Sequence, residues 1–315
     1  MINSSKLKKY IIAIFFSLTF VYSNAPLKAD IKVVTTIQPL HSLVANVMDG
    51  TGDLGLILEG SASPHNFSLK PSHAKMLEKA DVVFWFGEDL EIFLEKALKT
   101  IPTKAKIISF MKLKEIPKLK FREKNIFEHD DHKDEHKDEH KDEHDHAHGE
   151  FDVHLWLDPI NAKIMVKEIA HVLSDVDPSN AKKYNNNANK TLLKLDRMVL
   201  DIKKSINKRA RFITFHDAYQ YFEKRFEVAS MGALTVNTDV QPGAKQISEI
   251  RKHVKEENIK CIFSEPQFNP KIIKVIAEST NIKTGVFDPL GSSFKPGKSL
   301  YFSLINDLSK NLSGC

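Results

Sequence analysis

The stretch DPSNAKKYNNNANKTLLKLDRMVLDIKKSINK, residues 177–208, decides the fold. It opens with Asp177-Pro178, a typical helix start, because proline fits the first turn of a helix. Apolar residues then recur every three or four positions without an interrupting glycine or further proline; they are Ala181, Tyr184, Ala188, Leu192, Leu195, Met198, Val199, Ile202 and Ile206. Such a helix would be a rod of roughly 45 Å. We interpret it as a rigid helix that joins two lobes; a surface helix of a single domain is the alternative on pattern alone.

Short apolar runs rich in Val, Ile and Phe lie on both sides of this helix. They predict strands at 31–37, 54–58, 81–87 and 106–109 before it, and at 211–215, 227–231, 260–265 and 284–289 after it. Helical patterns separate them, among them 71–80 and a helix that opens at Asp158-Pro159. Two sets of alternating strands and helices predict an α/β fold with two lobes, each built on a mostly parallel sheet.

The N-terminus is typical of a signal peptide. Lys6, Lys8 and Lys9 precede a 12-residue apolar run, IIAIFFSLTFVY, which is too short to cross a bilayer comfortably. We favour cleavage after Ala29 over Ala25, because Pro26 makes the earlier site awkward; an uncleaved anchor is the alternative. No cysteine follows the run, so lipid attachment is not expected. The expected organisation is a signal peptide (1–29), a first lobe (30–176), the linking helix (177–208) and a second lobe (209–315).

The basic charge of the chain belongs largely to this leader. Its removal takes away four lysines and no acid, so the formal charge falls from +5 to +1, with 42 basic against 41 acidic side chains. The basic isoelectric point therefore gives no indication of nucleic-acid binding.

The segment 112–150 is charged and lacks an apolar period, so we expect it to be a solvated insertion in the first lobe. Seven of the 14 histidines lie in it, at His129, His132, His136, His140, His144, His146 and His148. Residues 128–150 carry 11 carboxylates and three lysines. A flexible chain loses entropy on ordering, so each metal site in it should be weak. We interpret it as a metal-collecting arm or occupancy sensor; a passive solubilising loop is the alternative.

Three other histidines are better placed for a fixed metal site. His65 lies in a loop after the second strand, His154 lies before a helix start, and His216 lies where a strand ends. In open α/β sheets ligands gather beyond the carboxyl ends of strands, so these side chains are expected to converge between the lobes. Neutral imidazoles suit zinc, and three of them leave one position open. Asp288 in FDPLG is the candidate fourth ligand, with water as the alternative.

The chain has only two cysteines, Cys261 and Cys315. In an exported protein paired thiols become disulfides, and a bridge here would attach the C-terminus to a predicted strand. Two unrelated buried thiols are the alternative.

The sequence resembles the periplasmic zinc-binding components of bacterial high-affinity zinc ABC importers, the ZnuA type. The similar stretches run through nearly the whole mature chain and include SPHNFSLKPSHAKMLEKADVVFWFGEDLE, HLWLDPINAK, FHDAYQYFEKRFEV, VQPGAKQISEIR, CIFSEPQFNP and DPLG. The resemblance implies two pseudo-symmetric lobes joined by one long helix, with the metal in the cleft between them. It also implies a histidine-rich insertion between the first two metal histidines and a disulfide between Cys261 and Cys315.

Position by position, His65, His154 and His216 match the three imidazole ligands of that family. Manganese-binding relatives carry a carboxylate where His216 stands, so the resemblance implies Zn²⁺ as the transported ion. Some zinc-binding members place a glutamate immediately before the first histidine, whereas this chain has Pro64. The fourth ligand is thereby left between Asp288 and water.

The resemblance implies a monomeric periplasmic binding protein that delivers zinc to an inner-membrane permease with a cytoplasmic ATPase, with no catalytic activity and no nucleic-acid partner. A secreted zinc hydrolase is one alternative, because three histidines with an open water position are also catalytic chemistry. The sequence offers neither an HExxH motif nor a clear activated nucleophile for it. A metal-binding adhesin or an extracytoplasmic zinc reservoir is the other alternative.

Overall fold

The computed structural model describes residues 30–101, 104–122, 124–126, 149–236, 238 and 242–315. The expected signal peptide and the seven histidines between His129 and His148, called the histidine repeat below, lie outside these ranges. Their predicted roles therefore stay predictions. Residues 31–315 form one compact unit.

Two four-stranded parallel sheets form the framework of this unit. The first has the order β2-β1-β3-β4, with β1 (Lys32–Thr35), β2 (Asp53–Leu56), β3 (Val82–Trp85) and β4 (Lys106–Ser109). The second has the order β6-β5-β7-β8, with β5 (Phe212–His216), β6 (Ala233–Thr235), β7 (Cys261–Ser264) and β8 (Lys283–Val286). The strand order is the same in both sheets. The predicted α/β fold with two pseudo-symmetric lobes is thus confirmed.

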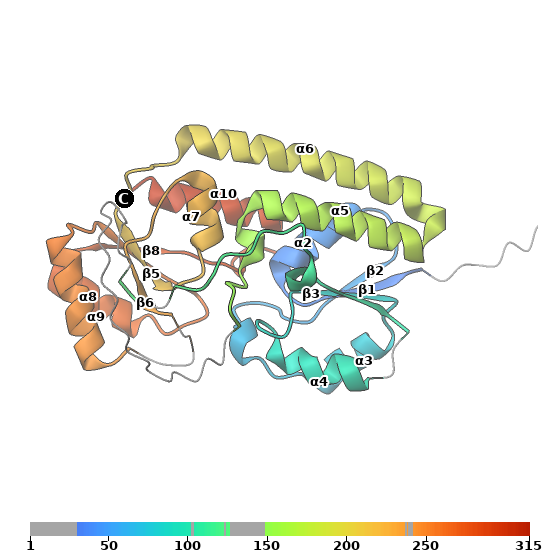
Figure 1. The fold of residues 1–315 in the computed structure, drawn as a ribbon, viewed down its shortest axis with the longest axis horizontal. Helices are drawn as coiled ribbons and strands as arrows, with labels where there is room; N and C mark the ends of the chain where they lie inside the picture. The colour runs from blue at the N-terminus through green and yellow to red at the C-terminus, as the bar shows by residue number, and fades with distance from the viewer. Residues whose placement is uncertain (1–29, 102–103, 123, 127–148, 237, 239–241) are drawn as a thin grey trace, which may run out of the picture. The chain divides into compact units, whose positions relative to one another are not determined.

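Helices cover both faces of each sheet (Figure 1). The first lobe contributes α2 (Gln38–Val47), α3 (Pro71–Glu78) and α4 (Ile92–Thr100), and the second contributes α7 (Gln220–Phe226), α8 (Ala244–Glu256) and α9 (Lys271–Thr280). A small apolar cluster, with Leu77 and Leu94, lies beneath α3 and α4. Another, with Ile250 and Ile276, lies beneath α8 and α9. The largest cluster contains buried residues of both lobes, so one continuous core joins them.

The long linking helix is present and shorter than predicted. It is α6 (Ala181–Ser205), whose 25 residues span about 37 Å. Pro178–Asn180 form a separate 3-10 turn before it. Helix α5 (Pro159–Val176) runs alongside α6 and begins where predicted, since the Asp158 side chain accepts a hydrogen bond from the Ile160 N–H (Figure 1). No helix among the described residues combines the length and apolar character needed to cross a membrane.

One predicted strand is wrong. Residues 227–231 were expected to form a strand, but Glu227 ends α7 in the left-handed conformation (φ 57°), and β6 begins only at Ala233. Val228 and Met231 are nevertheless buried, at 4% and 5% exposure. The apolar character of this run therefore reflects burial of a loop rather than strand pairing.

The last helix, α10 (Leu300–Leu312), returns to the first lobe. The Tyr301 hydroxyl donates to the backbone oxygen of Trp156 at 2.7 Å, and the Tyr301 N–H donates to the Ser42 hydroxyl at 3.0 Å. Just beyond α10, Cys315 is joined by a disulfide to Cys261, the first residue of β7, which confirms the predicted bridge. The final segment thus contacts both lobes.

The prediction of a solvated insertion at 112–150 is wrong for residues 116–126. Ile116 is only 1% exposed, Lys120 pairs with Phe151, and Ile126 pairs with Gly232 beside the edge strand β6. These residues follow no helical or strand period, because they belong to no helix or strand and only some of their side chains are buried. Residues 116–126, except for the undescribed 123, are therefore a packed stem, called the insertion stem below.

Candidate metal centre

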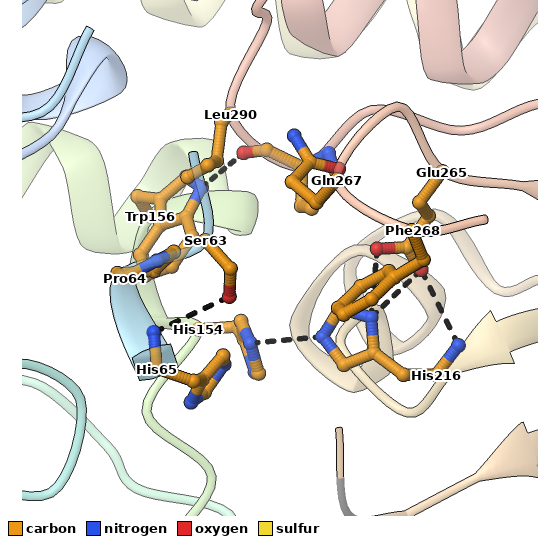
Figure 2. A pocket seen from close by; sticks show the side chains of 11 residues that line it. Ser63, Pro64, His65, His154, Trp156, His216, Glu265, Gln267, Phe268 and Leu290 are labelled. Carbon is orange, nitrogen blue, oxygen red and sulfur yellow. Dashed lines mark hydrogen bonds and ion pairs between the residues drawn. The ribbon is translucent and has the colours of Figure 1, made fainter. Parts of the chain in front are cut away.

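Three histidines from separate elements meet in the structure. His65 lies in the 3-10 turn Pro64–Asn66 (η1) after β2, His154 immediately precedes the turn Leu155–Leu157 (η3), and His216 is the last residue of β5. One ring nitrogen from each lies within 4.8 Å of the other two (Figure 2). His154 and His216 are buried, at 3% and 5% exposure, whereas His65 is partly exposed. The structure therefore brings together the three side chains that the sequence singled out.

The spacing of His154 and His216 suits a tetrahedral ion. Their Nε2 atoms are 3.4 Å apart. Two nitrogens bound to zinc at 2.0–2.1 Å with tetrahedral angles lie about 3.3–3.4 Å from each other. The His65 ring is farther away, with its centroid 5.7 Å from that of His154 and 6.0 Å from that of His216. His154 and His216 are thus already at ligand spacing, and His65 has to approach them.

A buried carboxylate stands behind each of these two rings. Asp152 Oδ1 lies 2.7 Å from His154 Nδ1 and accepts the His154 backbone N–H at 2.9 Å. Glu265 Oε1 lies 2.8 Å from His216 Nδ1, and Glu265 Oε2 lies 2.7 Å from it. A carboxylate at Nδ1 assigns the proton to that nitrogen and directs the Nε2 lone pair toward the other histidines. Both imidazoles are therefore held in the tautomer that a metal requires.

Sequence reasoning missed the role of these carboxylates. Asp152 was not considered, although its position two residues before His154 was a visible signal. Glu265, the last residue of the strand predicted at 260–265, was not assigned a supporting role either. It reaches His216 because β5 and β7 are paired neighbours and both residues lie at the carboxyl ends of their strands.

The electrostatics of the site follow from burial. Burial opposes protonation of His216, but the charge of Glu265 and its hydrogen bond outweigh burial and raise the pKa of His216. Burial also raises the pKa of Asp152 to about 7, against the backbone hydrogen bond from His154 and the charge of Arg122. A proton on His216 Nε2 would compete with a bound cation, so cation binding should weaken as the pH falls.

The space between the histidines is small. A cavity of about 10 Å³ lies among them and is bordered by Trp156 and Phe268 (Figure 2). The Trp156 ring centroid lies 5.3 Å from that of His154, and the Phe268 centroid lies 5.6 Å from that of His216. That volume is about one water-sized sphere. The site is therefore shaped for a single ion with aromatic walls.

The predicted fourth ligand is not part of this group. Asp288 accepts hydrogen bonds from Gln267 Nε2 at 2.9 Å, from the Leu290 N–H at 3.1 Å and from the Ser292 hydroxyl at 2.7 Å. The Ser292 N–H donates to the same carboxylate. Its oxygens are thus already engaged within the second lobe and its following loop.

Comparisons with known proteins identify the family of this chain. The family model described as the periplasmic component A of the zinc-uptake complex, ZnuA, matches residues 33–315. A high-affinity zinc uptake system protein ZnuA from Brucella abortus (strain 2308) is 42% identical over 303 residues, covering 90% of this chain and 91% of that protein. The protein of the same description from Yersinia pestis is 33% identical over 299 residues, covering 91% and 92%. A crystal structure of ZnuA superposes with a TM-score of 0.73 at 22% identity, covering 90% of this chain and 100% of that one, which supports the fold. The chain therefore belongs to the ZnuA family of periplasmic zinc-uptake components.

Proposed function

We propose that this chain captures one Zn²⁺ between His65, His154 and His216 and delivers it to the membrane permease of an ABC importer. The spacing of the two buried imidazoles carries the proposal, since their Nε2 atoms are 3.4 Å apart and each is backed by a carboxylate. Nitrogen ligands favour zinc over manganese, which prefers oxygen. The names of the relatives, zinc-uptake proteins, support the same ion.

The site supports binding rather than hydrolysis. A hydrolytic zinc site needs room for a substrate beside the metal-bound water. The cavity here holds about 10 Å³, too little for a peptide or ester next to an ion. Members of the matched family are transport components and not enzymes.

We also propose a location and partners that fit the role in an importer. The chain is exported by its signal peptide (1–29), carries no lipid, and acts as a periplasmic monomer with lobes at 30–176 and 209–315 joined through 177–208. Its partners are the inner-membrane permease and the ATPase bound to that permease. The histidine repeat supplies zinc to the cleft through several weak sites.

Calorimetric titration of residues 30–315 with zinc tests the proposal. One tight site per chain is expected, together with several weak ones from the repeat. Deletion of residues 128–150 should remove the weak sites and spare the tight one, because the three cleft histidines lie on folded elements. Absence of a tight site in the undeleted protein would refute zinc capture. Equal binding of the loaded and zinc-free forms to permease vesicles would instead point to a reservoir.

The fourth ligand is proposed to be water, which Asp288→Asn tests. Asparagine keeps the size of the side chain, and the Asp288 oxygens already accept four hydrogen bonds. We expect zinc affinity, measured by competition with a chelating dye, to change by less than about threefold, far below the roughly 10–100-fold cost of losing a residue that supports a metal. Asp175→Asn on the surface of α5 is the matched control. A loss above tenfold in Asp288→Asn alone would make Asp288 the fourth ligand.

A further inference from the structure

Arg122 in the insertion stem forms ion pairs with two buried carboxylates of the second lobe. Its Nε donates to Asp217 Oδ2 at 2.8 Å, and its Nη1 donates to Glu223 Oε2 at 3.0 Å. The Arg122 Nη2 contacts both carboxylates as well. The Arg122 side chain is 24% exposed, whereas those of Asp217 and Glu223 are 1% and 7% exposed. The planar guanidinium therefore donates hydrogen bonds to two carboxylates at once. A lysine ammonium lacks the planar set of donors that this arrangement needs.

The contact between Arg122 and Asp217 lies directly beside His216 in the sequence. Asp217 directly follows His216 at the end of β5, and Glu223 lies on α7, the next helix. The pair Arg122–Asp217 thus fixes the backbone immediately after His216 to the insertion stem.

On the other side, the same stem holds the chain that leads to His154. Lys120 pairs with Phe151, and the Asp152 N–H donates to the Leu119 oxygen at 2.8 Å. Tyr221 of α7 completes this connection. Its hydroxyl accepts a hydrogen bond from the Leu119 N–H at 3.0 Å and donates one to the backbone oxygen of Asp152 at 2.9 Å. Asp152 in turn holds the His154 ring. The stem is therefore hydrogen-bonded to Asp152, which supports His154, and to Asp217, which directly follows His216.

The position of the stem is specified by close packing. The Ala233 N–H donates to the Asn125 oxygen at 2.8 Å, and the Asn125 amide donates to the oxygens of Ala233 and Leu234 at 3.1 and 2.8 Å. A Cβ at Gly232 would lie only 2.7 Å from the Asn125 oxygen. The stem thus docks against the edge strand β6 at a place where only glycine leaves enough room.

We propose that Arg122 is a positioning residue for the metal: by clamping the insertion stem to Asp217 and Glu223, it keeps His154 and His216 at zinc spacing and slows zinc release. The inference rests on the proposed zinc-binding function. Holding ligands in place before binding lowers the ordering cost of capture, and a site loosened by about 1 Å loses much of its strength. Arg122 is not a metal ligand. Its hydrogen bonds therefore act through the backbone next to each of the two histidines.

The test compares Arg122→Met, the triple variant Arg122→Met/Asp217→Asn/Glu223→Gln, and the wild-type protein. The triple variant removes the buried negative charges that Arg122→Met alone leaves unpaired, so we expect it to fold even if the single variant does not. Zinc dissociation is followed by stopped-flow mixing with a chelator, and Co²⁺ binding by visible absorption, which reports the metal geometry. Both variants should release zinc on the order of tenfold faster and show a weaker Co²⁺ band. Circular dichroism of the triple variant should match the wild type.

Arg225→Met is the matched control. Arg225 makes an equally close bidentate pair with Asp158, at 2.7 Å for both contacts, and also joins α7 to the first lobe. Its partner Asp158 lies four residues after His154, at the start of α5, and neither directly precedes nor follows a metal histidine. Zinc release in Arg225→Met should therefore stay near the wild-type rate. A wild-type release rate in the folded triple variant, or equal acceleration in Arg225→Met, would overturn the role of Arg122. Failure of the wild-type protein to bind zinc would overturn the proposed function instead.

Discussion

His216→Ala is expected to lower zinc affinity by more than about 100-fold, because even residues that only support a metal ligand cost roughly 10–100-fold when removed. The variant loses one nitrogen of the 3.4 Å pair and leaves Glu265 buried without its imidazole partner. His65 cannot compensate, since it is already one of the three proposed ligands and its ring lies farther from His154 than that of His216 does. Competition titration against a chelator of known affinity measures the loss.

His171→Ala provides the comparison for this variant. His171 lies on α5 with 67% of its side chain exposed. Its substitution therefore removes the same chemical group, an imidazole, without changing the cleft. Its zinc affinity should equal that of the wild type. Tight 1:1 binding retained by His216→Ala would exclude His216 from the coordination of the ion.

Reduction of the Cys261–Cys315 bridge is expected to lower stability by about 4 kcal/mol on the chain-entropy account, a decrease of roughly 10 °C in the unfolding midpoint. The bridge closes a loop over a sequence separation of 54 residues. Zinc affinity should remain, because Cys261 begins β7 whereas Glu265 follows its end at Ser264, about 13 Å further along the strand. Thermal circular dichroism with and without reductant measures the effect.

The double variant Cys261→Ser/Cys315→Ser separates the bridge from the reductant. It should unfold at the temperature of the reduced wild type and should no longer respond to reductant. An unchanged midpoint on reduction would show that the bridge contributes nothing to stability. Loss of tight zinc binding at a temperature where the reduced protein stays folded would show that the bridge supports the cleft.

Much of the fold could be predicted, since buried parallel strands leave continuous apolar runs in the sequence. The run at 106–109 coincides with β4, and the other confirmed strands lie within a few residues of their predicted limits. The run at 227–231 misled because a buried loop and a buried strand have the same composition. The Met231 N–H does donate to the Phe212 oxygen of β5, but ladder pairing with β5 begins only at Ala233.

The three histidines of the site could be predicted from their positions near the ends of elements. Of their two carboxylate supports, Asp152 had a visible signal beside His154, whereas Glu265 had none, because it meets His216 through the pairing of two strands and lies 49 positions away in the sequence. Arg122 was hidden for a related reason. It lies in a charged segment whose composition predicts solvation, yet its charge is matched by Asp217 and Glu223 from about 95 and 101 positions later in the chain. Such pairing is a property of the folded chain and leaves no local pattern.

The return of α10 to the first lobe affects the order in which the protein can assemble. Tyr301 bonds to Ser42, 259 positions earlier, and to Trp156, 145 positions earlier. A nascent or partly translocated chain that still lacks its last residues therefore cannot complete the core of its N-terminal half. Contacts of such long sequence separation slow folding, because a large loop must close before they form. Premature termination near residue 298 would consequently expose apolar surface on α2 and α6, the helices against which α10 packs, and make the product a substrate for proteolysis.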